Sequence, residues 1–76
     1  MKFNHVLLKN LRGSRTLENV VEGLNIEAKK KGVEKKFSPS KLWYLENGKR
    51  KPDYFSLVVL ASYFDKTVEY FYMEEK

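Results

Sequence analysis

The sequence predicts an all-α protein that forms one small domain over residues 1–76. Leucine and valine side chains recur at spacings of three and four residues, which is the period of an α-helix. Residues that cap helix starts precede these stretches, and glycine or proline follows several of them. We therefore expect five short helices joined by short connections.

The first helix is expected to begin at Asn4, a good N-cap, with Phe3 packing on Leu8 ahead of it. Its apolar stripe consists of Leu7, Leu8 and Leu11. Gly13 should end the helix. His5 is the only histidine, so it has no partner for a metal site or a catalytic dyad, and we expect it at the surface.

The second helix is expected to begin at Thr16 and to stop at Gly32. Its buried face follows the helical spacing through Leu17, Val20, Val21 and Leu24. Three lysines at 29–31 complement the negative end of the helix dipole. The connector 33–37 follows, with Val33 and Phe37 pointing inward; it is too short to justify a sheet.

The third helix is predicted over about 38–47. Ser38 can cap it, and Pro39 suits its first position because the missing N–H has no helical partner there. Its apolar face is formed by Leu42 and Leu45. Gly48 accepts the left-handed conformation that ends a helix. A basic loop of Lys49, Arg50 and Lys51 comes next, and Pro52 prevents the helix from resuming.

The last two helices are expected to begin at Asp53 and Thr67. The inner face of the fourth is predicted to contain Leu57, Leu60, Ala61 and Phe64. Aromatic residues are concentrated here: Tyr63, Phe64, Tyr70, Phe71 and Tyr72. They either form part of a two-fold interface or belong to an ordinary core with hydrated tyrosine hydroxyls.

The charge distribution indicates a polyanionic partner. The net charge is +5, and residues 29–51 alone carry nine cations and two anions. Nucleic acid is the first candidate and an anionic membrane surface the second. The alternative is a solvated lysine-rich face. A membrane binder is disfavoured because the apolar faces are needed for a core.

The composition argues against several classes of protein and of functional site. The chain has no cysteine, which removes disulfides and thiolate metal sites, and we expect no cofactor. No apolar run is long enough to span a bilayer, and the start lacks a signal peptide, so a cytoplasmic location is expected. One histidine, no glycine-rich phosphate loop and no paired-carboxylate pocket argue against an enzyme.

The order of these motifs resembles the Cro and phage-repressor family of helix-turn-helix proteins, also called the Xre type. The most specific part is Leu-Trp-Tyr-Leu-Glu-Asn-Gly-Lys-Arg-Lys-Pro at 42–52, which is similar to the end of that family's recognition helix. The runs at 60–64 and 68–71 are similar to its closing helices, and Leu11-Arg12 to the end of its first helix. The resemblance covers nearly the whole chain. It implies a five-helix, lambda-repressor-like DNA-binding domain.

The resemblance also implies roles for individual residues. Arg12 and Glu46 should form a structural ion pair between the first and third helices. The base-reading residues would be Pro39, Ser40, Lys41 and Tyr44. Lys41 would donate to guanine, and Tyr44 would meet a phosphate or a thymine methyl. The DNA backbone would be contacted by Thr16, Asn19, Lys35, Lys36, Trp43, Asn47, Lys49, Arg50 and Lys51. For Trp43 the alternative is a position at the edge of the core.

Two features depart from the family. The segment from Asn25 to Phe37 is much longer than the usual tight turn between the second and third helices. We expect the second helix to run on by two turns and the chain to return through 33–37. Leu17 stands where the family has a phosphate-binding glutamine, and Val21 where it has a small alanine.

The function expected from these observations is sequence-specific binding of double-stranded DNA by a transcriptional regulator. A repressor of bacterial or mobile-element origin, binding an inverted-repeat operator as a homodimer, fits best. The alternative is a protein-binding module that keeps the fold, such as an antitoxin or an antirepressor.

Overall fold

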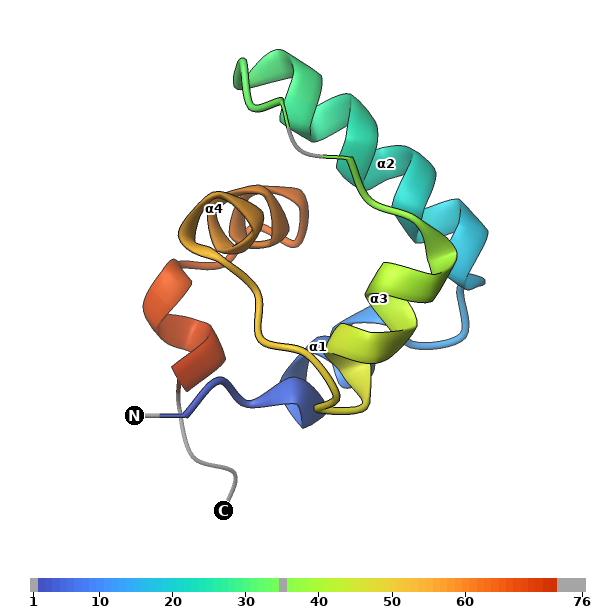
Figure 1. Cartoon of the computed structure of the whole chain (residues 1–76), viewed down its shortest axis with the longest axis vertical. Helices are drawn as coiled ribbons and strands as arrows, with labels where there is room; N and C mark the ends of the chain where they lie inside the picture. Colours follow the sequence, from blue (N-terminus) through green and yellow to red (C-terminus); the bar gives the residue numbers. More distant parts are fainter. Residues whose placement is uncertain (1, 35, 73–76) are drawn as a thin grey trace.

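The computed structural model describes residues 2–34 and 36–72, and these contain four α-helices and one 3-10 helix (Figure 1). The elements are α1 (His5–Arg12), α2 (Leu17–Lys30), α3 (Pro39–Glu46), α4 (Tyr54–Tyr63) and η1 (Val68–Tyr72). The all-α class is confirmed. The fifth predicted helix is corrected to a 3-10 helix of five residues. None of the helices in the described part of the chain has the length and apolarity needed to cross a membrane.

The four α-helices begin where the capping residues predicted. The side-chain oxygens of Asn4, Thr16, Ser38 and Asp53 each accept a hydrogen bond from a backbone N–H in the first turn. These N–H groups have no partner within the helix, so each cap satisfies a donor that would otherwise need water. The starts of all four helices are therefore set by residues adjacent in sequence.

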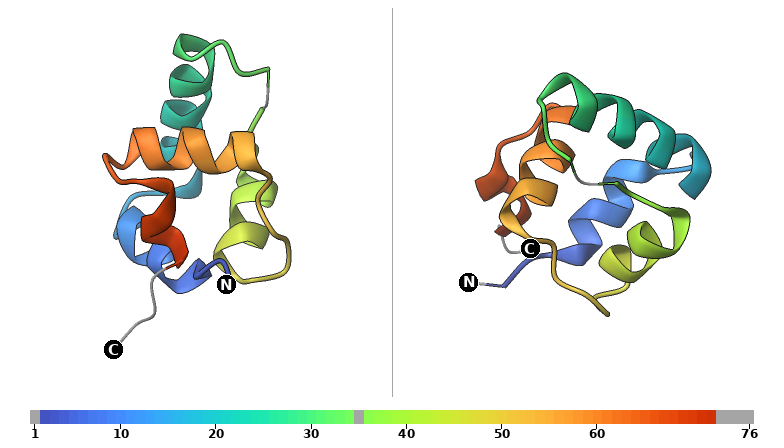
Figure 2. Two further views of the ribbon diagram at one scale, coloured as in Figure 1. Left: turned by 90° about the vertical axis from the view of Figure 1, so that its left-hand side faces the viewer. Right: turned by 45° about the horizontal axis from the view of Figure 1, so that its top comes forward.

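The core lies where α2 meets α3 and α4, and α1 and η1 cover it from the other side (Figure 2). Its fully buried side chains include Leu8, Val20, Leu24, Leu42, Leu45, Val59, Leu60 and Phe71. Val59 was not among the expected inner residues of α4. It is buried because α4 packs against both α2 and η1, so a wider arc of this helix is covered.

η1 joins the end of the described chain to its beginning. The Asn4 N–H donates to the Phe71 carbonyl at 2.6 Å, and the Phe3 ring stacks on the Phe71 ring with 5.7 Å between centroids. The remaining aromatics of this region are half-buried against the core: Tyr63, Phe64, Tyr70 and Tyr72. These contacts favour the core interpretation of the aromatic cluster over an open two-fold interface.

The long segment between the second and third helices folds as expected, by extension of α2 to Lys30. Gly32 then takes a positive φ of 69° and turns the chain. The connector returns along α2 and is fixed by Asn25: its side-chain oxygen accepts the Phe37 N–H at 2.8 Å, and its amide donates to the Phe37 carbonyl at 3.2 Å. Phe37 is buried. The end of α2 thus projects beyond α4 (Figure 2, left), while the start of α3 is held in place.

Candidate nucleic-acid interface

α3 is anchored at its C-terminal end by α1. Arg12 Nε donates to Glu46 Oε2 at 2.7 Å, so the expected ion pair is present. The Glu46 side chain is 1% exposed and that of Arg12 is 19% exposed. The guanidinium also donates to the Arg15 carbonyl at 2.6 Å. A buried carboxylate bound to one cation specifies a single placement of α3 against α1.

His5 gives α1 a second hold on the same helix end, which corrects the expectation of a surface residue. Its Nδ1 donates to the Glu46 carbonyl at 3.0 Å, since a carbonyl oxygen can only accept. That carbonyl lies in the last turn of α3, where helical partners are missing. The imidazole therefore caps α3 from outside, and this contact spans 41 residues of sequence.

Gly48 allows this close approach. A Cβ at position 48 would lie 2.8 Å from Cδ2 of the His5 ring, and φ at this residue is +69°. Both the backbone conformation and the space therefore require glycine. The Lys49 N–H then donates to the Tyr44 carbonyl at 2.9 Å and closes the turn. The geometry directs the basic loop back along α3.

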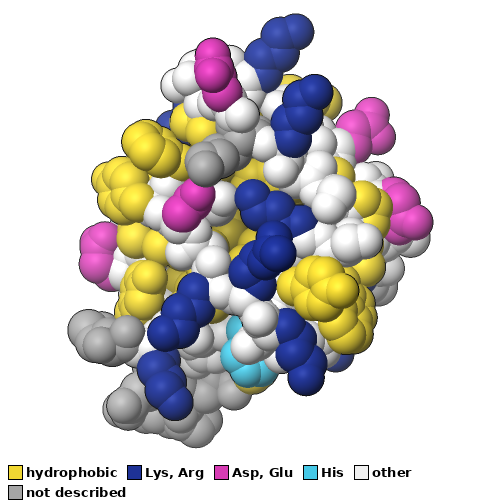
Figure 3. Space-filling model, viewed as in Figure 1, with side chains coloured by type: hydrophobic (Ala, Val, Ile, Leu, Met, Phe, Trp, Pro, Cys, Tyr) yellow, Lys and Arg dark blue, Asp and Glu magenta, His cyan; other side chains and the backbone are white. Residues whose placement is uncertain are grey.

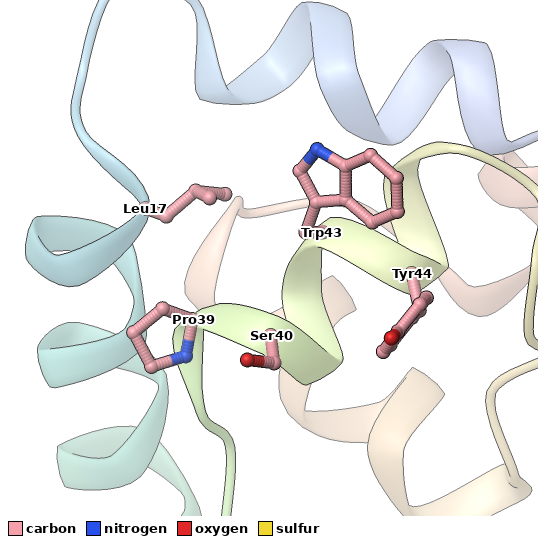
Figure 4. A pocket seen from close by; sticks show the side chains of 5 residues that line it. All are labelled: Leu17, Pro39, Ser40, Trp43 and Tyr44. Carbon is pink, nitrogen blue, oxygen red and sulfur yellow. The ribbon is translucent and has the colours of Figure 1, made fainter.

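The outer face of α3 forms a shallow depression with the start of α2 (Figure 4). We call it the α3 hollow; it has a volume of about 270 Å³ and is lined by Leu17, Pro39, Ser40, Trp43 and Tyr44. Leu17 extends from α2 toward the Trp43 indole, and the other residues come from α3 (Figure 4). Trp43 and Tyr44 are 46% and 44% exposed, with rings edge to face at 5.4 Å. Trp43 is thus exposed, and it lies beside the residues that are expected to read bases.

The Lys41 side chain does not join this face, and its role as a base reader stays a prediction. Its Nζ lies 3.5 Å from the Ser56 hydroxyl and 4.9 Å from the centroid of the Phe37 ring. Ser56 is fully buried at the start of α4, and Lys41 itself is half-buried. The amine thus points toward α4 and lies over the Phe37 ring, within the range of a cation–π contact. Pro39, Ser40 and Tyr44 remain exposed together.

The basic loop lies beside the α3 hollow. Lys49, Arg50 and Lys51 are all exposed. The Arg50 guanidinium carbon is 6.0 Å from the centroid of the Tyr44 ring, at the limit of a cation–π contact. In Figure 3, Lys and Arg side chains follow one another from the top to the bottom of the face that presents α3, and hydrophobic side chains gather over α3 beside them. Cations and aromatic rings thus share one surface.

The other residues predicted to contact DNA backbone are distributed more widely. Thr16 uses its hydroxyl oxygen as the cap of α2, accepting the Asn19 N–H at 3.1 Å. Asn19 and Lys36 are exposed. The Asn47 side-chain amide donates to the Trp43 carbonyl at 2.8 Å, so it supports the end of α3. Lys35 lies outside the described residues.

A second exposed aromatic pair was not singled out in the sequence. Tyr54 and Phe55, in the first turn of α4, are 66% and 56% exposed, with centroids 5.9 Å apart. Helical spacing turns Phe55 away from Leu57 and Leu60, but it puts Tyr54 beside the inner face, so the exposure of Tyr54 was not expected. They give the molecule an apolar surface separate from the α3 hollow.

The described residues contain no group of three or more His, Asp or Glu side chains that could hold a metal ion. Comparison with protein-family models, with curated proteins and with solved structures gave no match to the chain.

Proposed function

We propose that the protein binds double-stranded DNA sequence-specifically and acts as a transcriptional repressor of bacterial or mobile-element origin. The observation that carries the proposal is the pairing of an exposed, anchored helix with three exposed cations at its end. Cations grip phosphates without reading sequence, and an exposed helix face reads base edges. The resemblance to Cro-like helix-turn-helix proteins supports the same arrangement.

The dimensions of α3 suit the major groove. An α-helix with its side chains is about 10–12 Å across, and the major groove, roughly 12 Å wide, admits it. If the outer face of α3 enters the groove, Lys49 and Arg50 are placed at the groove edge, where the phosphates lie. The buried ion pair of Arg12 with Glu46 fixes the helix before binding, so little ordering is needed when DNA binds.

A homodimer on an inverted repeat completes the proposal, because one short helix reads too few base pairs for useful specificity. The exposed Tyr54–Phe55 pair is the surface proposed for contact with the second subunit. Light scattering would measure the mass in solution, and Phe55→Ser should shift it toward the monomer. An unchanged dimer would place the subunit contact elsewhere.

The proposal is tested by fluorescence anisotropy of labelled duplex DNA over a range of salt concentrations. Lys49→Ala and Arg50→Ala should each weaken binding to every sequence and make the slope of log K against log salt less negative by about 0.9 for each phosphate that is no longer neutralised. Lys66→Ala, at an exposed lysine in the turn after α4, is the matched control and should leave affinity and slope unchanged. Identical slopes for all three variants would refute the backbone grip.

The second candidate function is a protein-binding module such as an antitoxin or antirepressor. The observation that favours it is the exposure of two aromatic pairs, Trp43–Tyr44 and Tyr54–Phe55. Aromatic anchors are typical of protein interfaces, and their contribution depends little on salt. Absence of any salt-dependent DNA binding, together with salt-insensitive capture of a purified partner, would favour this candidate.

A further inference from the structure

The described outer face of α3 lacks the side chains that read purines by paired hydrogen bonds. Such readers are Arg or Lys for guanine and Asn or Gln for adenine. Lys41 is turned toward Ser56 and Phe37, and the Asn47 amide is bonded to the Trp43 carbonyl. The side-chain hydrogen-bonding groups left at the α3 hollow are the hydroxyls of Ser40 and Tyr44 and the indole N–H of Trp43. None of them makes a bidentate pair with a purine.

The walls of the α3 hollow are instead apolar or aromatic. Leu17 supplies one wall from α2, and the indole of Trp43 and the ring of Pro39 supply others from α3 (Figure 4). The one apolar group that a natural base displays in the major groove is the C5 methyl group of thymine. 5-Methylcytosine carries the same methyl at the same position. The chemistry of the hollow therefore matches a methylated pyrimidine.

Charge decides between DNA and a protein as the occupant. Arg50 lies 6.0 Å from the Tyr44 ring, which lines the hollow, and Lys49 and Lys51 are exposed in the same loop. An apolar protein side chain would need no such cations beside it, whereas a base edge is always flanked by phosphates. The surroundings thus complement a nucleic acid duplex.

We infer that the α3 hollow binds the C5 methyl group of a pyrimidine in the major groove, so that the bound sequence is selected by thymine rather than by guanine. This inference rests on the proposed DNA binding. Removal of one enclosed methyl group should weaken binding about fourfold in each half-site, by the usual free energy of burying one methyl-sized group.

The test is a paired selection with the wild-type protein. One library of random duplexes contains thymine and the other contains deoxyuridine in its place, which removes only the methyl group. The thymine library should yield a motif with fixed thymines, and the uracil library should lose enrichment at those positions. Anisotropy then compares the selected duplex with versions that carry uracil, cytosine or 5-methylcytosine there. For each half-site that is changed, thymine should bind about fourfold more tightly than uracil, and 5-methylcytosine more tightly than cytosine.

Variants locate the effect. Trp43→Ala changes an exposed side chain and should abolish the difference between thymine and uracil, while Lys49→Ala should weaken both duplexes by the same factor. Equal binding of thymine and uracil at every selected position would overturn the inference and leave DNA binding intact. Failure to enrich any sequence from the thymine library would overturn the proposed function itself.

Discussion

The Arg12–Glu46 pair permits a quantitative test of how α3 is held. Arg12→Met keeps most of the side-chain volume but leaves the Glu46 carboxylate, 1% exposed, without its cation. Removal of one partner of a fully buried pair costs about 3–5 kcal/mol. The site is open on the Arg12 side, where the side chain is 19% exposed, so we expect about 3 kcal/mol. The stability of a domain of this size is on the order of 4–11 kcal/mol, so this decrease is large.

Removal of the negative charge at Glu46 should cost less stability than removal of the positive charge at Arg12. Glu46→Gln retains an acceptor, and Arg12 keeps its bond to the Arg15 carbonyl and its access to water, so we expect a decrease of about 1 kcal/mol. The double variant Arg12→Met with Glu46→Met removes both charges and should recover most of the stability that Arg12→Met alone removes.

Urea unfolding followed by circular dichroism at the helical band measures these free energies. A decrease below about 0.5 kcal/mol for Arg12→Met would refute the argument that a buried carboxylate is left uncompensated. The argument would also be refuted if the losses of stability of Arg12→Met and Glu46→Met, measured separately, summed to that of the double variant. Additive losses would mean that the two charges do not interact.

Three further predictions concern single side chains. Asn25→Ala should destabilise the protein by about 2 kcal/mol in urea unfolding, because two backbone groups of the connector are left without their partner, whereas Asn19→Ala on the exposed face of α2 should change stability little. Gly48→Ala should cost more than Gly32→Ala in the same assay; both residues have φ of +69°, but only at position 48 would a Cβ meet a side chain. Lys41→Ala should leave the sequences selected from random DNA unchanged, since its amine lies against α4, and a changed motif would identify it as a base reader.

Helix boundaries could be predicted because the groups that set them are neighbours in sequence. The oxygen of a cap such as Ser38 bonds an N–H three residues ahead, and a glycine such as Gly48 ends a helix through its own φ. The return of the chain to Phe37 was predicted for a similar reason, since only Gly32 could stop a helix that still showed the apolar period.

The features that escaped prediction depend on contacts between residues far apart in the chain. The imidazole of His5 reaches the end of α3, 41 residues away, and nothing near His5 in the sequence indicates it. Lys41 precedes the buried Leu45 by four residues, so the helical period puts it at the edge of the buried face, but the sequence does not show that Ser56 and Phe37 lie there. The α3 hollow likewise needs Leu17 from another helix. The sequence analysis named the residues that line this hollow, but it did not predict that Leu17 and Trp43 would lie on the same surface as the reading face of α3.

The central claim, that α3 and its basic loop bind duplex DNA, is tested most directly by the salt dependence of binding to the duplex selected from random DNA. In the proposed homodimer, three loop cations in each subunit would contact about six phosphates, so log K should fall with log salt with a slope of about −5. A slope near zero, or a selection that enriches no sequence, would contradict the claim.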